Sequence, residues 1–183
     1  MEDENKNSGK DRNYKLAPTE WIHKNTFAIG GLENIGYAPN QDFLLVLSSQ
    51  GQGIFNCKTG EKIARQNEEW WDKFNKKTNS IVGFDVLENI EIPTCGLYGE
   101  DHLLKTTQDS WSLIVTEPEP DDKPFEKYLV KRIYLVTPDK KEKIFAGKDS
   151  ACELRAFGFS DTGKTFVIAL SCDLIIYSRT LTL

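Results

Sequence analysis

One stretch of the chain fits a nucleotide-binding pattern. Residues 158–165 are Gly-Phe-Ser-Asp-Thr-Gly-Lys-Thr, which matches the phosphate-loop pattern G-x-x-x-x-G-K-[ST] at every position. Such a loop holds phosphates with backbone amides at the start of a helix. The residues after Thr165 are Phe-Val-Ile-Ala-Leu, a β-branched and aromatic run that favours a strand. We therefore expect a turn that enters a strand, and no cofactor is predicted.

The histidines offer a second candidate for chemistry. The chain has 2 histidines, His23 and His102, which are too few for a typical His-rich metal site. His102 follows Glu100 and Asp101, so a carboxylate–histidine pair for acid–base catalysis is one interpretation. A solvated turn between strands is the other interpretation, and it is the one we favour. No catalytic or metal-binding residue is predicted.

Acidic and aromatic side chains are the candidates for binding another protein. Residues 117–124 are Glu-Pro-Glu-Pro-Asp-Asp-Lys-Pro, and prolines together with repelling acids predict an exposed loop and not a strand. Trp70 and Trp71 are adjacent, so on a helix they point about 100° apart. One is expected to enter the core, and the other to be half-exposed as an interface anchor. The predicted partner-binding residues are Trp70, Trp71, Glu117, Glu119, Asp121 and Asp122.

The elements that position these candidates come from a β unit used more than once. Residues 36–56 and 158–178 share one pattern, displaced by 122 residues without a gap: aromatic residue, turn, apolar strand, polar turn and second apolar strand. A weaker third copy begins at Ile133 and parallels the stretch from Ile54. Such self-similarity indicates repeated β units. Three units are predicted, at about 26–66, 80–147 and 150–183.

Extended segments and one short helix are expected along the rest of the chain. Strand-like runs lie at 26–29, 43–48, 53–57, 81–86, 88–92, 102–107, 111–116, 128–136 and 142–146. The helix is predicted at 68–76, with Asn67 as its cap and Trp70, Trp71 and Phe74 on one face.

The repeated turns resemble a known repeat family. The stretch 38–62 is similar to a blade of the WD40-type β-propeller family, and Phe-Ser-Asp-Thr-Gly-Lys at 159–164 resembles the turn that leads into a strand of such a blade. The Trp-Asp pair of that family is replaced by Phe55-Asn56 and Tyr177-Ser178. The resemblance implies blade-like sheets that serve as a binding platform. Three units fall short of the roughly four blades that closure needs. We therefore predict an all-β fold of repeated antiparallel sheets, either propeller-like or an open, incomplete stack.

Composition narrows the functional class. The 183 residues carry a net charge of −5, whereas a protein that binds nucleic-acid backbone needs a basic surplus. No apolar run reaches the about 18 residues of a membrane span, and the acidic N-terminus does not resemble a secretory signal. Residues 1–19 are predicted to be a disordered tail and 20–183 a single domain. No nucleic acid and no membrane is expected as a partner.

The cysteines favour a cytoplasmic location. Cys57, Cys95, Cys152 and Cys172 are far apart and form no C-x-x-C pair, which argues against a zinc site. Cys57 and Cys172 lie beside strand-like runs and are interpreted as reduced, buried residues.

These observations favour a non-enzymatic protein-binding module. The stretches 25–27, 36–37, 45–51 and 60–65 also look like an uncharacterised family of bacterial single-domain proteins. The acidic excess predicts a basic partner, and our leading hypothesis is an inhibitor or immunity protein that occludes a cognate toxin enzyme. The alternatives are an enzyme with an acid–base site near His102 and a structural module of a larger assembly.

Overall fold

The computed structural model describes residues 20–116, 130–149 and 152–179. Within these ranges all regular elements are strands or short 3-10 turns, and no α-helix is formed. The strands are β1 (Trp21–Ala28), β2 (Leu32–Tyr37), β3 (Phe43–Ser48), β4 (Gly51–Asn56), β5 (Glu61–Gln66), β6 (Ser80–Val82), β7 (Glu91–Pro93), β8 (Cys95–Gly96), β9 (Ser112–Thr116), β10 (Arg132–Val136), β11 (Lys143–Lys148), β12 (Leu154–Phe159), β13 (Thr165–Leu170) and β14 (Asp173–Arg179). The 3-10 turns are η1 (Trp71–Lys73) and η2 (Asp85–Leu87).

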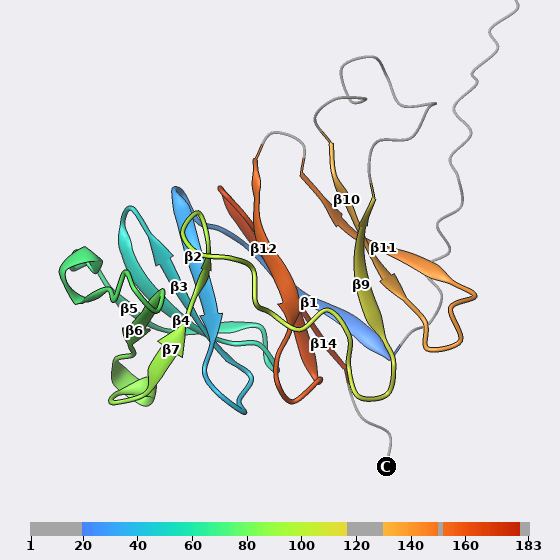
Figure 1. The fold of residues 1–183 in the computed structure, drawn as a ribbon, viewed down its shortest axis with the longest axis horizontal. Coiled ribbons are helices and arrows are strands. Elements are labelled where there is room, and N and C mark those ends of the chain that lie inside the picture. Colours follow the sequence, from blue (N-terminus) through green and yellow to red (C-terminus); the bar gives the residue numbers. More distant parts are fainter. Residues whose placement is uncertain (1–19, 117–129, 150–151, 180–183) are drawn as a thin grey trace, which may run out of the picture.

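The strands pair into four antiparallel sheets within the described ranges (Figure 1). Two larger sheets have the orders β5-β4-β3-β2-β8 and β1-β14-β13-β12. A smaller sheet has the order β11-β10-β9, and β6 and β7 form a separate pair. The prediction of an all-β fold of repeated antiparallel sheets is confirmed at this level.

The sequence repeat corresponds to repeated structure. β12 begins and ends 122 residues after β2, and β13 begins and ends 122 residues after β3. β14 likewise begins 122 residues after β4. The run after Lys164, which fits the phosphate-loop pattern, is the buried strand β13 and not a helix. The weaker copy from Ile133 is also confirmed, because β10 pairs with β11 as β4 pairs with β5.

Two features of the predicted units are corrected. The strand expected at 26–29 does not join the unit that follows it: β1 pairs with β14, so the N-terminal strand completes the C-terminal sheet and covers an edge that would otherwise offer unpaired amides. The unit at 80–147 is divided among three sheets, because β8 joins β2 while β9 starts another sheet. Residues 102–107 form only isolated bridges, of Leu104 with Phe159 and Thr106 with Ser112.

The hydrophobic core consists of three clusters, each between neighbouring sheets. Along β3, Leu44 and Val46 belong to the cluster shared with β13 and β14, whereas Leu45 and Leu47 belong to the cluster shared with β6 and β7. The third cluster joins β13 to β9, β10 and β11. Because β3 and β13 are covered on both faces, their apolar residues run continuously and do not alternate with polar ones.

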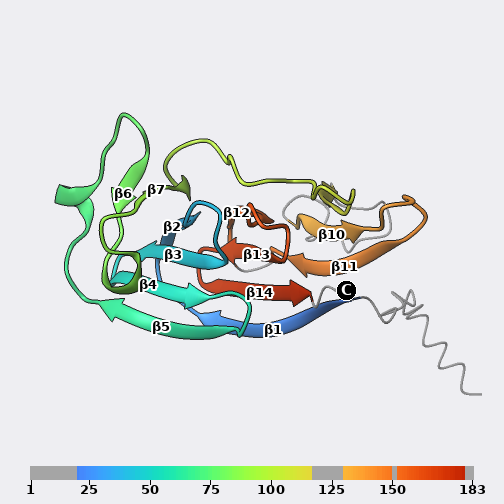
Figure 2. The same cartoon turned by 90° about the horizontal axis from the view of Figure 1, so that it is seen from below.

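One irregular segment crosses the first strands of both repeats. Residues 93–104 leave β7, pair with β2 through β8, and reach β12 at Leu104. Figure 2 shows this segment on the side of the sheets opposite β1 and β5. The equivalent glycines of the repeat make room for it: a Cβ at Gly36 would lie 2.1 Å from the carbonyl oxygen of Pro93, and a Cβ at Gly158 would lie 2.4 Å from Leu103 Cβ.

The predicted helix at 68–76 is wrong. Only η1 forms there, and no side chain caps it. The Trp70 indole nitrogen donates to the Ser48 carbonyl over 3.0 Å, and a bridge between Asn75 and Ser80 turns the chain into β6. A segment this short gains little from helix formation in isolation, so these tertiary contacts determine its conformation.

Candidate functional site

An aromatic cluster lies where η1 meets the crossing segment. The rings of Trp70 and Trp71 are stacked at 4.2 Å, so they do not point apart as a helix would place them. Trp70 is 1% exposed, whereas Trp71 is partly exposed. Phe74 meets both tryptophan rings edge to face, and Tyr98 meets Trp71 at 4.6 Å. The expectation that one tryptophan is buried and the other half-exposed is confirmed.

The crossing segment adds apolar surface beside Trp71. Leu97 is 45% exposed and Tyr98 is 37% exposed. The backbone of Tyr98 is held by the buried Asn34, whose amide nitrogen donates to the Tyr98 carbonyl (2.8 Å) and whose oxygen accepts from the Tyr98 amide (2.9 Å). Tyr98 is therefore presented on a fixed backbone beside Trp71, and the exposed Leu97 precedes it in the chain. We call these three residues the aromatic surface.

Charges of both signs border the aromatic surface. The Lys76 ammonium lies 5.9 Å from the Trp71 ring, within the range of a cation–π contact. Glu68 and Lys73 form an exposed ion pair of 3.0 Å, which contributes little to stability because water screens it.

Sequence interpretation identified only part of this surface. Trp70 and Trp71 were predicted partner-binding residues, and Trp70 is so deeply buried that it can act only by supporting Trp71. The other four, Glu117, Glu119, Asp121 and Asp122, lie outside the described residues. Leu97 and Tyr98 were missed; the available signal was their position before Gly99, whose φ of +82° marks a turn that exposes its neighbours.

The segment around His102 forms a turn held by the Asp101 carboxylate. The His102 ring lies 3.4 Å from the carbonyl oxygen of Glu100, not from a carboxylate. Asp101 accepts from the Leu103 amide (3.1 Å) and from the Lys105 ammonium (2.8 Å). Lys105 also donates to the Phe157 carbonyl, which fixes the crossing segment to β12. These contacts are those of a structural turn.

The two repeated turns meet in a buried polar network around Asp42. Oδ1 of Asp42 accepts from Ser160 Oγ (2.7 Å), Thr162 Oγ1 (2.6 Å) and Thr165 Oγ1 (3.0 Å), all within the stretch that fits the phosphate-loop pattern. Burial raises the pKa of Asp42, but the three hydroxyls and Lys58 outweigh it, so the pKa lies below its usual value. The polar residues of that stretch therefore bind a carboxylate of the same chain.

The cysteines depart from expectation at one position. Cys57 is buried and free, as predicted, but Cys172 forms a disulfide with Cys152, with 5.8 Å between the Cα atoms. Sequence spacing could not show that the hairpin of β12 and β13 brings together Cys152 before it and Cys172 after it, 20 residues apart. Cys152, Cys172 and Asp173 lie close enough together to hold a metal, but the disulfide uses both sulfurs.

Neither length nor hydropathy of any described helix would allow it to cross a membrane. No family model matches the chain, and no curated protein is significantly similar to it in sequence.

Proposed function

We propose that this protein is a non-enzymatic module that binds another protein through the aromatic surface. The observation that carries the proposal is Trp71: it is partly exposed, it is stacked on the buried Trp70, and it meets the exposed ring of Tyr98. Tryptophan and tyrosine on a rigid backbone lose little conformational freedom when they become buried, which is why they dominate binding energy at interfaces.

The way the polar groups are used supports binding over catalysis. Asp42, Asp101 and Arg179 each hold distant parts of the chain together; Asp101, for instance, accepts from the Phe157 amide 56 residues away. Arg179, for example, donates to Asp109 and to Glu20 across 70 and 159 residues. In the described residues these three charged groups are engaged in contacts that join segments of the chain, which is a structural use. An enzyme with an acid–base site near His102 is the second candidate.

The finer architecture belongs to the same proposal. We infer a propeller-like but incomplete arrangement, in which the two repeated sheets act as blades and the segment 93–104 covers their first strands. The sheet β1-β14-β13-β12 has four strands, and β5-β4-β3-β2 are four consecutive strands of the five-stranded sheet. Both support the proposal, since propeller blades have four antiparallel strands.

The proposed partner is a basic protein, and the narrowest form of the proposal is an immunity protein of bacterial type that occludes a toxin enzyme. The net charge of −5 supports a basic partner, because complementary charge accelerates association. A toxin gene next to the gene for this chain would identify the partner to test. A structural module of a larger assembly is the competing non-enzymatic role.

The experiment is a binding titration of the purified partner against matched variants. Trp71→Ala removes the proposed anchor, and a loss of about 2 kcal/mol, or roughly thirtyfold in Kd, is expected. Ile22→Ala is the control, because Ile22 is 50% exposed and lies on β1 in the other sheet. His102→Gln separates the second candidate: an enzyme would lose turnover, whereas a binding module would keep its affinity. Equal affinities for Trp71→Ala and Ile22→Ala would refute the proposed surface.

A further inference from the structure

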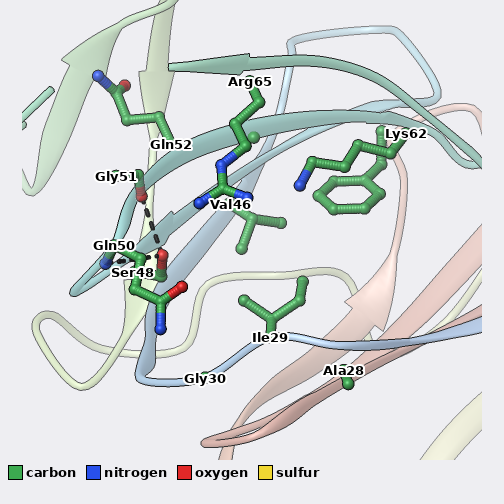
Figure 3. A pocket seen from close by; sticks show the side chains of 12 residues that line it. Ala28, Ile29, Gly30, Val46, Ser48, Gln50, Gly51, Gln52, Lys62 and Arg65 are labelled. Atoms are coloured by element: carbon green, nitrogen blue, oxygen red, sulfur yellow. Dashed lines mark hydrogen bonds between the residues drawn. The ribbon is translucent and has the colours of Figure 1, made fainter. Parts of the chain in front are cut away.

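A small pocket lies between the two repeated sheets, beside the turn that follows β1 (Figure 3). Its volume is about 80 Å³. A single water needs roughly 10–15 Å³, so the pocket has room for a group of several heavy atoms. Its walls come from residues 28–30 on one side and from β3, β4 and β5 on the other.

Part of the pocket lining is apolar, and a glycine leaves space beside it. Ile29, Val46 and Phe55 are large apolar residues of this lining. Gly53 lies opposite Val46 in the ladder, and a Cβ there would lie 3.1 Å from the Phe55 ring and 3.5 Å from Lys62 Cε. A side chain at position 53 would therefore occupy the space that the pocket leaves.

Two cationic side chains of β5 line the pocket. Figure 3 shows Lys62 and Arg65 extending from the same strand into the pocket. The Lys62 ammonium lies 5.8 Å from the centre of the Phe55 ring. Gly53 pairs with Arg65 and Phe55 pairs with Lys62, so the ladder itself places both charges on the pocket face of the sheet.

The positive charge of the pocket is not balanced. No acidic residue lines it, and among the described residues neither Lys62 nor Arg65 has a carboxylate within ion-pair distance. Burial and the neighbouring charge of Arg65 both lower the pKa of Lys62. In a chain whose net charge is −5, Lys62 and Arg65 bring two positive charges to one pocket. A bound anion would relieve their mutual repulsion.

We propose that this pocket binds a small oxyanion, the carboxylate or phosphate group of a small molecule. The guanidinium of Arg65 supplies the planar pair of donors that such a group accepts in a bidentate manner. Lys62 supplies the second charge, and the amide of Gln50 borders the site from the turn between β3 and β4. This site is separate from the aromatic surface, and neither proposal depends on the other.

The test is an NMR titration of the full chain with inorganic phosphate and, separately, with sodium acetate, at an ionic strength held constant with chloride. Saturable shifts are expected at the amides of residues 29–30 and 51–53. Saturation with phosphate alone assigns the site to phosphate groups, and saturation with acetate alone assigns it to carboxylates. If neither anion produces saturable shifts at these amides, the proposal is wrong.

Matched variants distinguish the pocket from general screening. Arg65→Gln is expected to weaken binding by at least about tenfold, since a charge-assisted bidentate contact contributes more than the 1.4 kcal/mol that corresponds to that factor. Lys143→Gln removes one exposed charge from β11 and should leave the affinity unchanged. Both side chains are exposed, so neither change should affect folding, which the same spectra report. An equal loss in the two variants would contradict the proposal.

Discussion

Replacing Asp42 tests whether the two repeated sheets depend on one buried carboxylate. Asp42 comes from the turn before β3, and its three hydroxyl donors come from the equivalent turn and start of β13, 118 to 123 residues away. Asp42→Ala therefore removes the only charged acceptor of a network that joins distant parts of the described chain. The Asp42 side chain is buried, so its removal leaves the three hydroxyl groups without the acceptor that they share.

The expected loss follows from the contacts. A hydrogen bond to a charged group contributes about 1.5–3 kcal/mol. The three bonds share one oxygen, and Ser160 and Thr165 keep other partners at 3.1–3.4 Å, so their contributions do not add. We expect Asp42→Ala to lower the free energy of unfolding by about 3–4 kcal/mol, within the range found when one partner of a buried charged network is removed.

Urea unfolding followed by tryptophan fluorescence measures this loss. The control is Asp161→Ala, which removes the same charge from the exposed partner turn and one hydrogen bond, that from the Asn40 amide. This control should lose less than about 1 kcal/mol. A loss below about 1 kcal/mol for Asp42→Ala as well would refute the claim that the network joins the sheets.

The same carboxylate predicts a dependence of stability on pH. Its pKa in the folded protein lies below the unfolded value of about 3.9. A group with a lowered folded pKa stabilises the protein above its unfolded pKa, and this contribution is lost as pH falls through the folded value. Unfolding free energies measured from pH 5 downwards should therefore fall more steeply for the wild type than for Asp42→Asn; parallel profiles would contradict this reasoning.

Three further predictions concern other parts of the fold. Gly158→Ala should lower the free energy of unfolding by about 1–3 kcal/mol, because the added Cβ would collide with the crossing segment. In Gly30→Ala the added Cβ meets only the flexible end of Gln50, so this control should lose less stability. Thermal unfolding of both variants measures the difference. Reduction of the disulfide Cys152–Cys172 should lower the free energy of unfolding in urea by about 3 kcal/mol, because the bond closes a loop over 20 residues. An unchanged urea midpoint under reducing conditions would contradict this prediction. Burial raises the pKa of Cys95 to about 12, so its thiol should react with Ellman's reagent at pH 8 only after unfolding; rapid reaction of the native protein would show that this side chain is accessible.

The repeat was predictable from sequence because both copies have the same local requirements. Each needs a glycine near the end of its first strand, a turn, and a strand covered on both faces, so the continuous apolar run of residues 43–47 and its counterpart could be recognised without knowing their neighbours. The pairing of β1 with β14 could not be recognised in this way. It depends on two segments more than 140 residues apart, whose local patterns fit several sheets equally well.

The sites were less predictable for a similar reason. Trp71 stood out as an adjacent tryptophan, but its exposure depends on the stacking with Trp70 and on Tyr98, which arrives from the crossing segment. Lys62 and Arg65 are exposed charges of the edge strand β5, and no sequence pattern distinguished them from other surface charges. Only the approach of residues 28–30 from the other sheet turns that surface into a pocket. Such contacts between distant segments cannot be predicted from the sequence pattern of one segment.

Hydrogen–deuterium exchange of the full chain, with and without a bound partner protein, tests the central proposal most directly. The aromatic surface predicts slower amide exchange on binding within residues 70–76 and 96–99, together with the acidic stretch 117–122. Protection confined to β1 and β14, with residues 70–76 and 96–99 exchanging as in the free protein, would show that the partner binds elsewhere.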